Sequence, residues 1–218
     1  MTFSQDRDLL VFEPRLFCEM AWPGQTIAAG DDGTLDGDQF TSESADFTAT
    51  GIKPGMVLTV RPATGPAALE IVEVVSGTTL TVSALRADPE SETIVPRIAA
   101  EDELSWLIAS FGPQAEAIAM EMLAHFGLSP ADPASRWTAD DIVHPEVLRP
   151  VSAYGVLSLA LAAAANRGDL QDGYWSKAMH YRANFEQFLP RIELGLSRDG
   201  DSQPAVVRHL GAPRLRRD

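Results

Sequence analysis

Several side chains are of types that do chemistry, and their spacing decides which chemistry is open to them. His144 and Glu146 form an isolated His-x-Glu pair. In zinc deaminases such a pair is followed by paired cysteines that complete the metal site, but the single cysteine of this chain, Cys18, lies far upstream. The remaining histidines, none of which stands at metal-ligand spacing from another, are His125, His180 and His209. We therefore expect no metal site.

Covalent catalysis and phosphate binding are not indicated either. Cys18 has no activating base near it in the sequence, so a buried and inert thiol is expected. Asp140 and Asp141 lie between Thr138 and Pro145, a pattern that indicates the start of a helix. The chain has no Gly-x-Ser-x-Gly motif and no Gly-rich loop followed by Lys. The prediction is a protein that is not an enzyme and has no catalytic, cofactor-binding or metal-binding residue.

An acidic stretch runs from Asp31 to Asp38 with two glycines inside it. As a calcium loop it lacks the spaced ligands and the distal Glu of an EF-hand. The sequence therefore predicts a solvated turn here.

Composition sets the broad class. The chain has 218 residues, of which 45% are hydrophobic and 22% charged, as in ordinary folded proteins. Its net charge of -14 argues against a general nucleic-acid binder, because phosphates attract clustered Lys and Arg. One cysteine forms no intrachain disulfide and suits a cytosolic setting. Met1 to Asp6 has no basic segment followed by an apolar one, so no secretory signal is expected.

Three helices are predicted in the second half of the chain, over the ranges 113–125, 145–165 and 174–190. The middle one is apolar enough to suggest a membrane span, but Arg149 and Pro150 interrupt it and it barely reaches the required ~20 residues. A buried or interface helix is the expectation. Its small-residue face, Ala160, Ala163 and Ala164, suits close packing. Two interpretations remain open: a helical hairpin packed on itself, or this face packed against a neighbouring subunit.

The range 26–110 has the texture of a β-rich domain, with short period-two segments between turn residues. The expected strands are 40–44, 46–50, 56–61, 69–75 and 78–85, with further candidates at 93–98 and 103–109. Lys53-Pro54-Gly55 and Ser76-Gly77 are predicted turns. Short strands at this spacing predict a small barrel or sandwich.

The two ends complete the predicted organisation. Residues 1–25 should form a helix over 4–12 and an extended arm over 15–22, and 111–190 the helical domain. Residues 191–218 should hold a strand over 192–196, a partner strand over 206–210 and a basic tail, which is either a frayed end or an arm for an acidic partner. The predicted fold class is α+β: a connector-like helical bundle with an inserted small β-barrel or sandwich and a C-terminal β-hairpin or extended tail.

Three segments together resemble the head-to-tail connector (adaptor) proteins of tailed bacteriophages and related prophage elements. They are Phe111 to Gln114 with the helix ending at Gly127-Leu128, Glu146 to Pro150 with the Ala-rich helix and the aromatic face from Trp175 to Phe185, and Leu194 to Asp201 with Arg208 to Arg217. The similarity covers about half of the chain. The β-rich segment departs from the mostly helical adaptors, and β-rich character is typical of the neighbouring stopper proteins.

The resemblance implies a structural virion protein of the phage neck, assembled in the bacterial host cytoplasm. Copies would form a ring, a dodecamer, that joins the portal protein to a stopper or tail-completion protein, with DNA only as passing cargo and no membrane contact. The acidic balance suits a channel that DNA passes without sticking. Candidate portal contacts are Arg214, Arg216 and Arg217. The alternatives are another neck or tail-completion protein and, outside phages, a ligand-binding module or hydrolase.

Overall fold

The computed structural model describes residues 1–20, 23–128, 137–165, 171–197 and 204–208. The chain divides into two compact units. Gln5–Phe111 forms one, called here the barrel unit, and Met1–Ser4 with Gly112–Asp218 forms the other, called the helical unit. Each unit has its own core and is described by itself.

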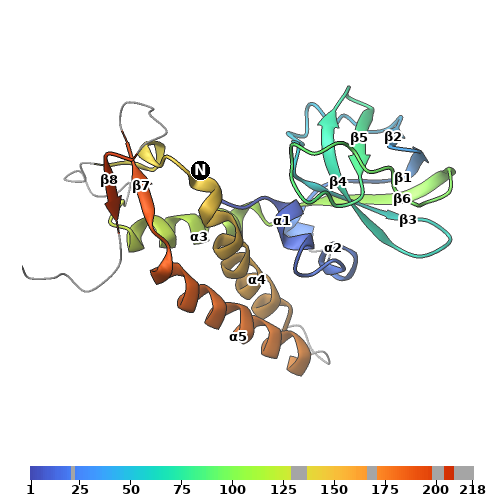
Figure 1. The fold of residues 1–218 in the computed structure, drawn as a ribbon. Helices are drawn as coiled ribbons and strands as arrows, with labels where there is room; N and C mark the ends of the chain where they lie inside the picture. Colours follow the sequence, from blue (N-terminus) through green and yellow to red (C-terminus); the bar gives the residue numbers. More distant parts are fainter. Residues whose placement is uncertain (21–22, 129–136, 166–170, 198–203, 209–218) are drawn as a thin grey trace, which may run out of the picture. The chain divides into compact units, whose positions relative to one another are not determined.

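The barrel unit is built around a closed antiparallel β-barrel (Figure 1). Its strands are β1 (Thr26–Asp36), β2 (Gln39–Ser42), β3 (Val57–Arg61), β4 (Ala67–Val74), β5 (Thr79–Ser83) and β6 (Glu101–Ala109). Around the barrel they follow the order β1-β2-β5-β4-β3-β6, and β6 closes onto β1. Closure pairs every strand on both sides, so the barrel has no exposed sheet edge.

The barrel interior is filled by side chains. Alternation along the strands turns one set of residues inward, and the buried cluster comprises Leu35, Phe40, Phe47, Ile52, Leu58, Val60, Leu69, Ile71, Leu80, Val82, Leu104, Trp106 and Ile108. At its centre the rings of Phe40, Phe47 and Trp106 lie 5.6 to 6.2 Å apart, centroid to centroid. Trp106 meets both phenylalanine rings edge to face, and such contacts add to the stabilisation from the burial of apolar surface. The barrel is a packed core.

Two short helices, α1 (Asp6–Leu10) and α2 (Leu16–Glu19), and the 3-10 turn η1 (Pro23–Gln25) belong to this unit. Asp8 caps α1, since the Gln5 N–H donates to Oδ2 of Asp8 at 2.8 Å. Phe17 on α2 is buried, and its ring meets Phe111 edge-on at 5.2 Å. On α1, Leu9 and Leu10 are buried as well, so both helices have the apolar contacts that a short helix needs to persist.

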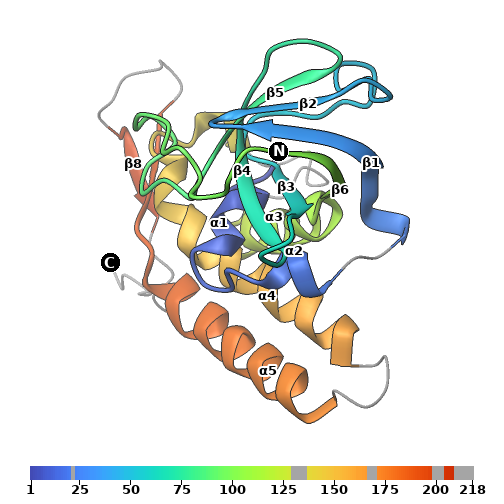
Figure 2. The same ribbon diagram turned by 90° about the vertical axis from the view of Figure 1, so that its right-hand side faces the viewer.

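The helical unit contains three long helices: α3 (Gly112–His125), α4 (Arg149–Ala165) and α5 (Gln171–Phe188). Helix α4 packs against both of the others, and α5 runs alongside it (Figure 2). The short 3-10 helices η2 (Ala139–Asp141) and η3 (Pro145–Leu148) precede α4 in the chain. A third, η4 (Leu189–Arg191), leads from α5 to strand β7 (Leu194–Leu196), which is followed by β8 (Val206–Arg208). Tyr154 on α4 stacks on Tyr181 of α5 with ring centroids 6.1 Å apart.

Strand β7 is paired on both sides. Strand β8 lies along one side, and the backbone around Ile142 lies along the other. There the Val143 N–H donates to the Gly195 carbonyl at 3.1 Å, and the Ser197 N–H to the Asp141 carbonyl at 2.8 Å. These bonds tie the segment before α4 to the strand after α5.

The predicted fold class is wrong. It made a connector-like helical bundle the main body, with the β-rich segment inserted into it. The protein instead has a mixed α/β fold in which a closed six-stranded barrel, with α1 and α2, is a compact unit of its own. The prediction failed mainly because β1 was not recognised as a strand. Its Gly- and Asp-rich sequence has low strand propensity, and its pairing with β6 joins residues far apart in the chain.

Several single elements also differ from their predictions. Residues 15–22 were expected to be extended, but α2 occupies Leu16–Glu19. The expected strand 46–50 is a turn, in which Oδ1 of Asp46 accepts bonds from the Ala49 N–H and the Thr48 hydroxyl. No strand is formed at 93–98, which is among the described residues. The predictions for β3, β4, β5, α3 and α5 are confirmed within a few residues.

The stretch Pro145–Ala165 is long and apolar enough to cross a membrane by length and composition. Most of its apolar window, 61%, is buried inside the protein. Because α3 and α5 cover it, the apolar character is that of a core helix.

Candidate interaction surfaces

The residue pairs that were considered for catalysis or metal binding make contacts with residues close to them in the sequence. His144 and Glu146 lie exposed beside η3, with Nδ1 of His144 3.0 Å from Oε1 of Glu146. Asp141 closes a turn by accepting the Thr138 N–H at 2.7 Å. Within the described residues, no group of three or more His, Cys, Asp or Glu side chains is arranged to hold a metal ion. Burial raises the pKa of the half-buried Cys18 thiol, which keeps it protonated and weakly nucleophilic.

The acidic stretch Asp31 to Asp38 was predicted to be a solvated turn, and this is wrong because most of it is strand β1. A bulge between Gly30 and Gly33 turns Asp32 toward its neighbours. Its Oδ1 accepts the Ser42 hydroxyl at 2.7 Å and its Oδ2 the Ser44 N–H at 2.8 Å. These donors hold the pKa of Asp32 well below its usual value. The carboxylate pins the end of β2 to β1.

A buried ionic cluster holds α1 on the barrel. Oε1 of Glu70 on β4 lies 2.7 Å from Nε of Arg7 and 2.7 Å from Nη2 of Arg86. Arg7 also donates to the Arg86 carbonyl at 2.6 Å, and Arg86 to the Ser91 carbonyl at 2.6 Å. The three charged side chains are almost completely buried. Removing one member of such a cluster leaves a buried charge uncompensated, and here the cluster ties together three segments distant in sequence.

Sequence reasoning missed this cluster. Arg7 lies in a predicted short helix, Glu70 in a predicted strand and Arg86 directly after another, and nothing local marks the two arginines as buried. The one usable signal was the position of Glu70, a charged residue between the apolar Leu69 and Ile71 of a predicted strand.

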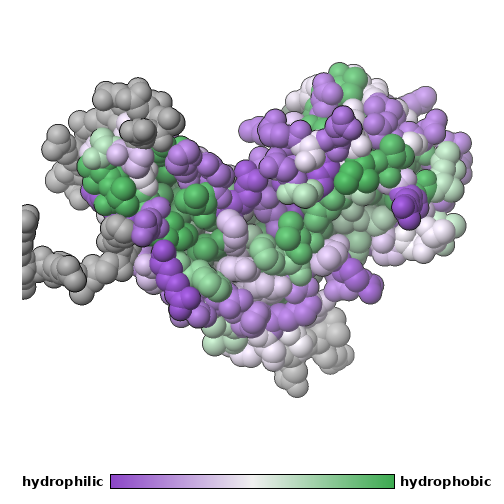
Figure 3. Space-filling model, in the orientation of Figure 1, coloured by the Kyte–Doolittle hydropathy of each residue, from purple (hydrophilic) through white to green (hydrophobic). Residues whose placement is uncertain are grey.

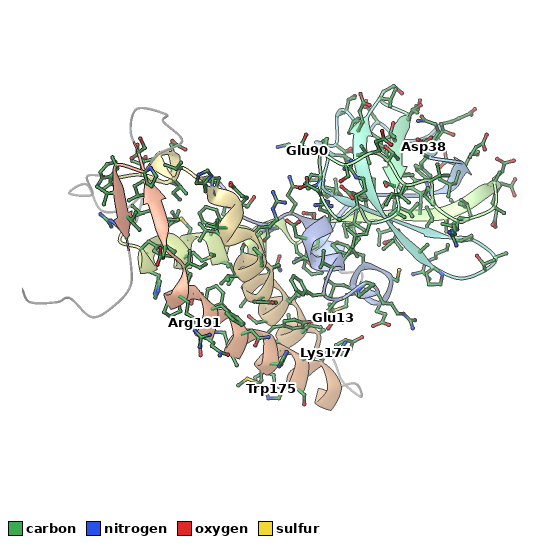
Figure 4. The ribbon with its side chains drawn as sticks, viewed as in Figure 1. Glu13, Asp38, Glu90, Trp175, Lys177 and Arg191 are labelled. Atoms are coloured by element: carbon green, nitrogen blue, oxygen red, sulfur yellow. The ribbon has the colours of Figure 1, made fainter. Side chains whose placement is uncertain are left out.

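Net charge is concentrated in one unit. The barrel unit has 18 Asp and Glu against 6 Lys and Arg, a net charge of -12, whereas the helical unit has 13 against 11, a net charge of -2. Hydrophilic residues cover much of the visible barrel face in Figure 3, and Asp38 and Glu90 are two of its acids in Figure 4. A surface of this sign repels phosphate backbones.

Large apolar side chains are exposed on the helical unit. Trp175 and Met179, one turn apart on α5, are 52% and 53% exposed, and Leu159 on α4 is 39% exposed. Trp175 projects outward from α5 (Figure 4). Phe188 is also partly exposed, with Arg191 over its ring at 5.6 Å. Exposed Trp and Met on one helix face are typical of protein interfaces.

Only part of the predicted subunit-packing face is exposed to solvent. Ala160 and Ala164 are buried inside this chain, and Ala163 is exposed on the same helix. The predicted contacts Arg214, Arg216 and Arg217 lie outside the described residues.

Comparisons with known proteins return no match among protein-family models, curated proteins or solved structures.

Proposed function

We propose that this protein is a structural component of the neck of a tailed bacteriophage or related prophage particle. Copies form a ring that joins the portal protein to the next neck or tail protein and continues the DNA channel. The proposal begins from the similarity of three helical and C-terminal segments to head-to-tail connectors. It does not depend on a helical-bundle fold.

The observation that supports ring formation is the pair of exposed apolar side chains on α5. Trp175 and Met179 each leave about half of their surface in water, although α5 buries its opposite face on α4. Ala163 and Leu159 on α4 are exposed as well and offer small and aliphatic surface to a neighbour. A second copy that covers these side chains removes this apolar area from water.

The charge of the barrel unit supports the channel part. A net charge of -12 on 107 residues, Gln5–Phe111, is suited to a wall along which DNA moves without binding. The same charge disfavours any role that requires the barrel to hold nucleic acid.

Native mass spectrometry over a range of protein concentrations, alone and with portal rings, tests the proposal. We expect a closed assembly near twelve copies, either alone or on the portal. The variants Trp175→Ser and Met179→Ser should need a higher protein concentration than the wild type to assemble. Truncating a central interface Trp costs about 2 kcal/mol or more, which corresponds to a shift of about thirtyfold per interface.

Val95→Ser is the matched control, because Val95 is an equally exposed apolar residue on the barrel unit, 56% exposed. It should assemble as the wild type does. A wild-type protein that stays monomeric both alone and with portal rings would contradict the proposal.

The closed barrel favours a second candidate in the same setting, a stopper-like neck or tail-completion protein. Stoppers are typically β-rich, and the barrel unit, Gln5–Phe111, makes up about half of this chain. Co-assembly separates the two: an adaptor binds the portal ring directly, whereas a stopper binds only after the adaptor is in place.

A further inference from the structure

The barrel unit is joined to the rest of the chain by two segments, and one buried carboxyl links them. The chain enters the barrel unit at Gln5 and leaves it at Phe111. Next to the entry point, Asp6 on α1 is only 6% exposed. Its Oδ1 accepts the Phe111 N–H at 2.8 Å, and the Ser110 side chain is a further hydrogen-bond partner. The first residue of α1 and the last residue of the unit are therefore held together through Asp6.

The surroundings of Asp6 favour its neutral form. Desolvation is the largest influence, and it raises the pKa of this carboxyl to about 6. The bonds from Ser110 and Phe111 partly oppose this, because they stabilise the carboxylate, and the like charge of Asp8 on the same helix adds to the increase.

No cation compensates the charge among the described groups that act on Asp6. Arg7, the next residue on α1, is engaged by Glu70 and by the Arg86 carbonyl. On the side of β6, Ser110 and Phe111 offer neutral donors only. Ionised Asp6 is thus a buried charge without an ion-pair partner, which is costly in a protein interior.

We propose that Asp6 is a proton-operated latch between the two connecting segments: protonated, it holds α1 on the end of β6, and ionised, it lets this contact open. The inference is independent of the phage-neck proposal, because it concerns only contacts within the barrel unit.

The direction of the pH dependence follows from linkage. In the closed contact the pKa of Asp6 is raised above the ordinary carboxyl value of 3.8, which applies when the contact is open. The contact is therefore strongest below about pH 4, weakens as the pH rises through about 6, and changes no further above that value. A difference between 3.8 and about 6 corresponds to a change of about a hundredfold in the opening equilibrium.

Two-dimensional NMR of the full chain tests the latch. The Phe111 amide signal and the Asp6 carboxyl carbon should titrate together with a midpoint near 6. The hydrogen-exchange protection factor of the Phe111 amide should fall by up to about a hundredfold between pH 4 and pH 7. Protection factors are used because intrinsic exchange itself accelerates with pH.

Three variants complete the experiment. In Asp6→Asn the Phe111 signal and its protection should lose this pH dependence. In Ser110→Ala the midpoint should rise, since a bond that lowers the pKa is gone. Asp38→Asn, which removes a surface carboxyl, should behave as the wild type does. An Asp6 carboxyl that titrates near 4 in the wild type, or equal pH dependence in wild type and Asp6→Asn, would overturn the latch, and the wild-type titration decides even if a variant does not fold.

Discussion

Gly155 on α4 lies directly against Ile118 on α3. A methyl group built on Gly155 would come within 2.7 Å of Cγ2 of Ile118, so the two helices approach more closely than any side chain at this position would allow. Ile118 is almost completely buried. The α3–α4 contact thus depends on a residue without a side chain.

Gly155→Ala should therefore destabilise the helical unit despite the higher helix propensity of Ala. Overpacking costs typically about 1–3 kcal/mol, against a gain of roughly 1 kcal/mol from propensity. Urea unfolding monitored by circular dichroism measures the difference. Gly173→Ala on α5, where a methyl group meets no atom within 4 Å, is the control and should be neutral or stabilising. The pair Gly155→Ala with Ile118→Ala should lose less than the sum of the two changes.

The buried carboxylate of Glu70 should be essential to the barrel unit. Glu70→Gln keeps the shape of the side chain but removes the carboxylate that Arg7 and Arg86 share, so that Arg7 retains only Asp8, 3.5 Å away, as an ion-pair partner. Breaking a buried ion pair in this way costs about 3–5 kcal/mol. The midpoint of urea unfolding of the full chain should fall accordingly. Glu73→Gln, an exposed carboxylate on the same strand, should change the stability by less than about 0.5 kcal/mol.

At position 103, glycine should give a more stable protein than the natural glutamate. Its φ of 56° is in the left-handed region, at an irregularity in the pairing of β6 with β1. Glu103→Gly should stabilise the protein by about 0.5–1 kcal/mol, since glycine adopts this conformation without steric cost. The neighbouring Asp102→Gly should destabilise it. Equal effects of the two changes in thermal unfolding would argue against strain at position 103.

Reversing the charge of the barrel surface should create DNA binding. The wild type, with its barrel unit at -12, should not retard duplex DNA in a gel at low salt. A variant with Asp38→Lys and Glu90→Lys together should do so weakly, and its binding should disappear as salt rises. In assembled particles the same variant should slow DNA release. A wild-type protein that binds DNA would contradict a channel wall of the proposed kind.

The basic C-terminus should be needed for docking on the portal. Truncation after Gly211 removes Arg214, Arg216 and Arg217 and should abolish binding to portal rings in a sedimentation assay. Replacing the three with Lys keeps the charge and separates electrostatic attraction from bidentate recognition by guanidinium groups. Unchanged docking of the truncated chain would sink the assignment of these residues.

The sequence by itself determined the elements whose signals are local. Helix α3 is marked by apolar spacing and by Pro113 and Gly127 at its two ends, and α5 by aromatic residues at helical spacing. Strands β4 and β5 are marked by alternation on either side of Ser76-Gly77. The prediction that the helix over 145–165 is not a membrane span rested on Arg149 and Pro150. The apolar character of α4 has its physical reason in the packing of α3 and α5 against that helix.

Tertiary structure alone decided what depends on distant partners. Strand β1 is poor in strand-forming residues and exists because β6, some 70 residues away, pairs along it. The burial of Arg7 is set by Glu70 and Arg86, which lie 63 and 79 residues further along the chain. Ala160 and Ala163 look alike in sequence, yet one is in the core and the other in solvent, because the neighbouring helices cover only part of α4. Local propensity is visible in a short window, whereas burial and long-range pairing are properties of the folded whole.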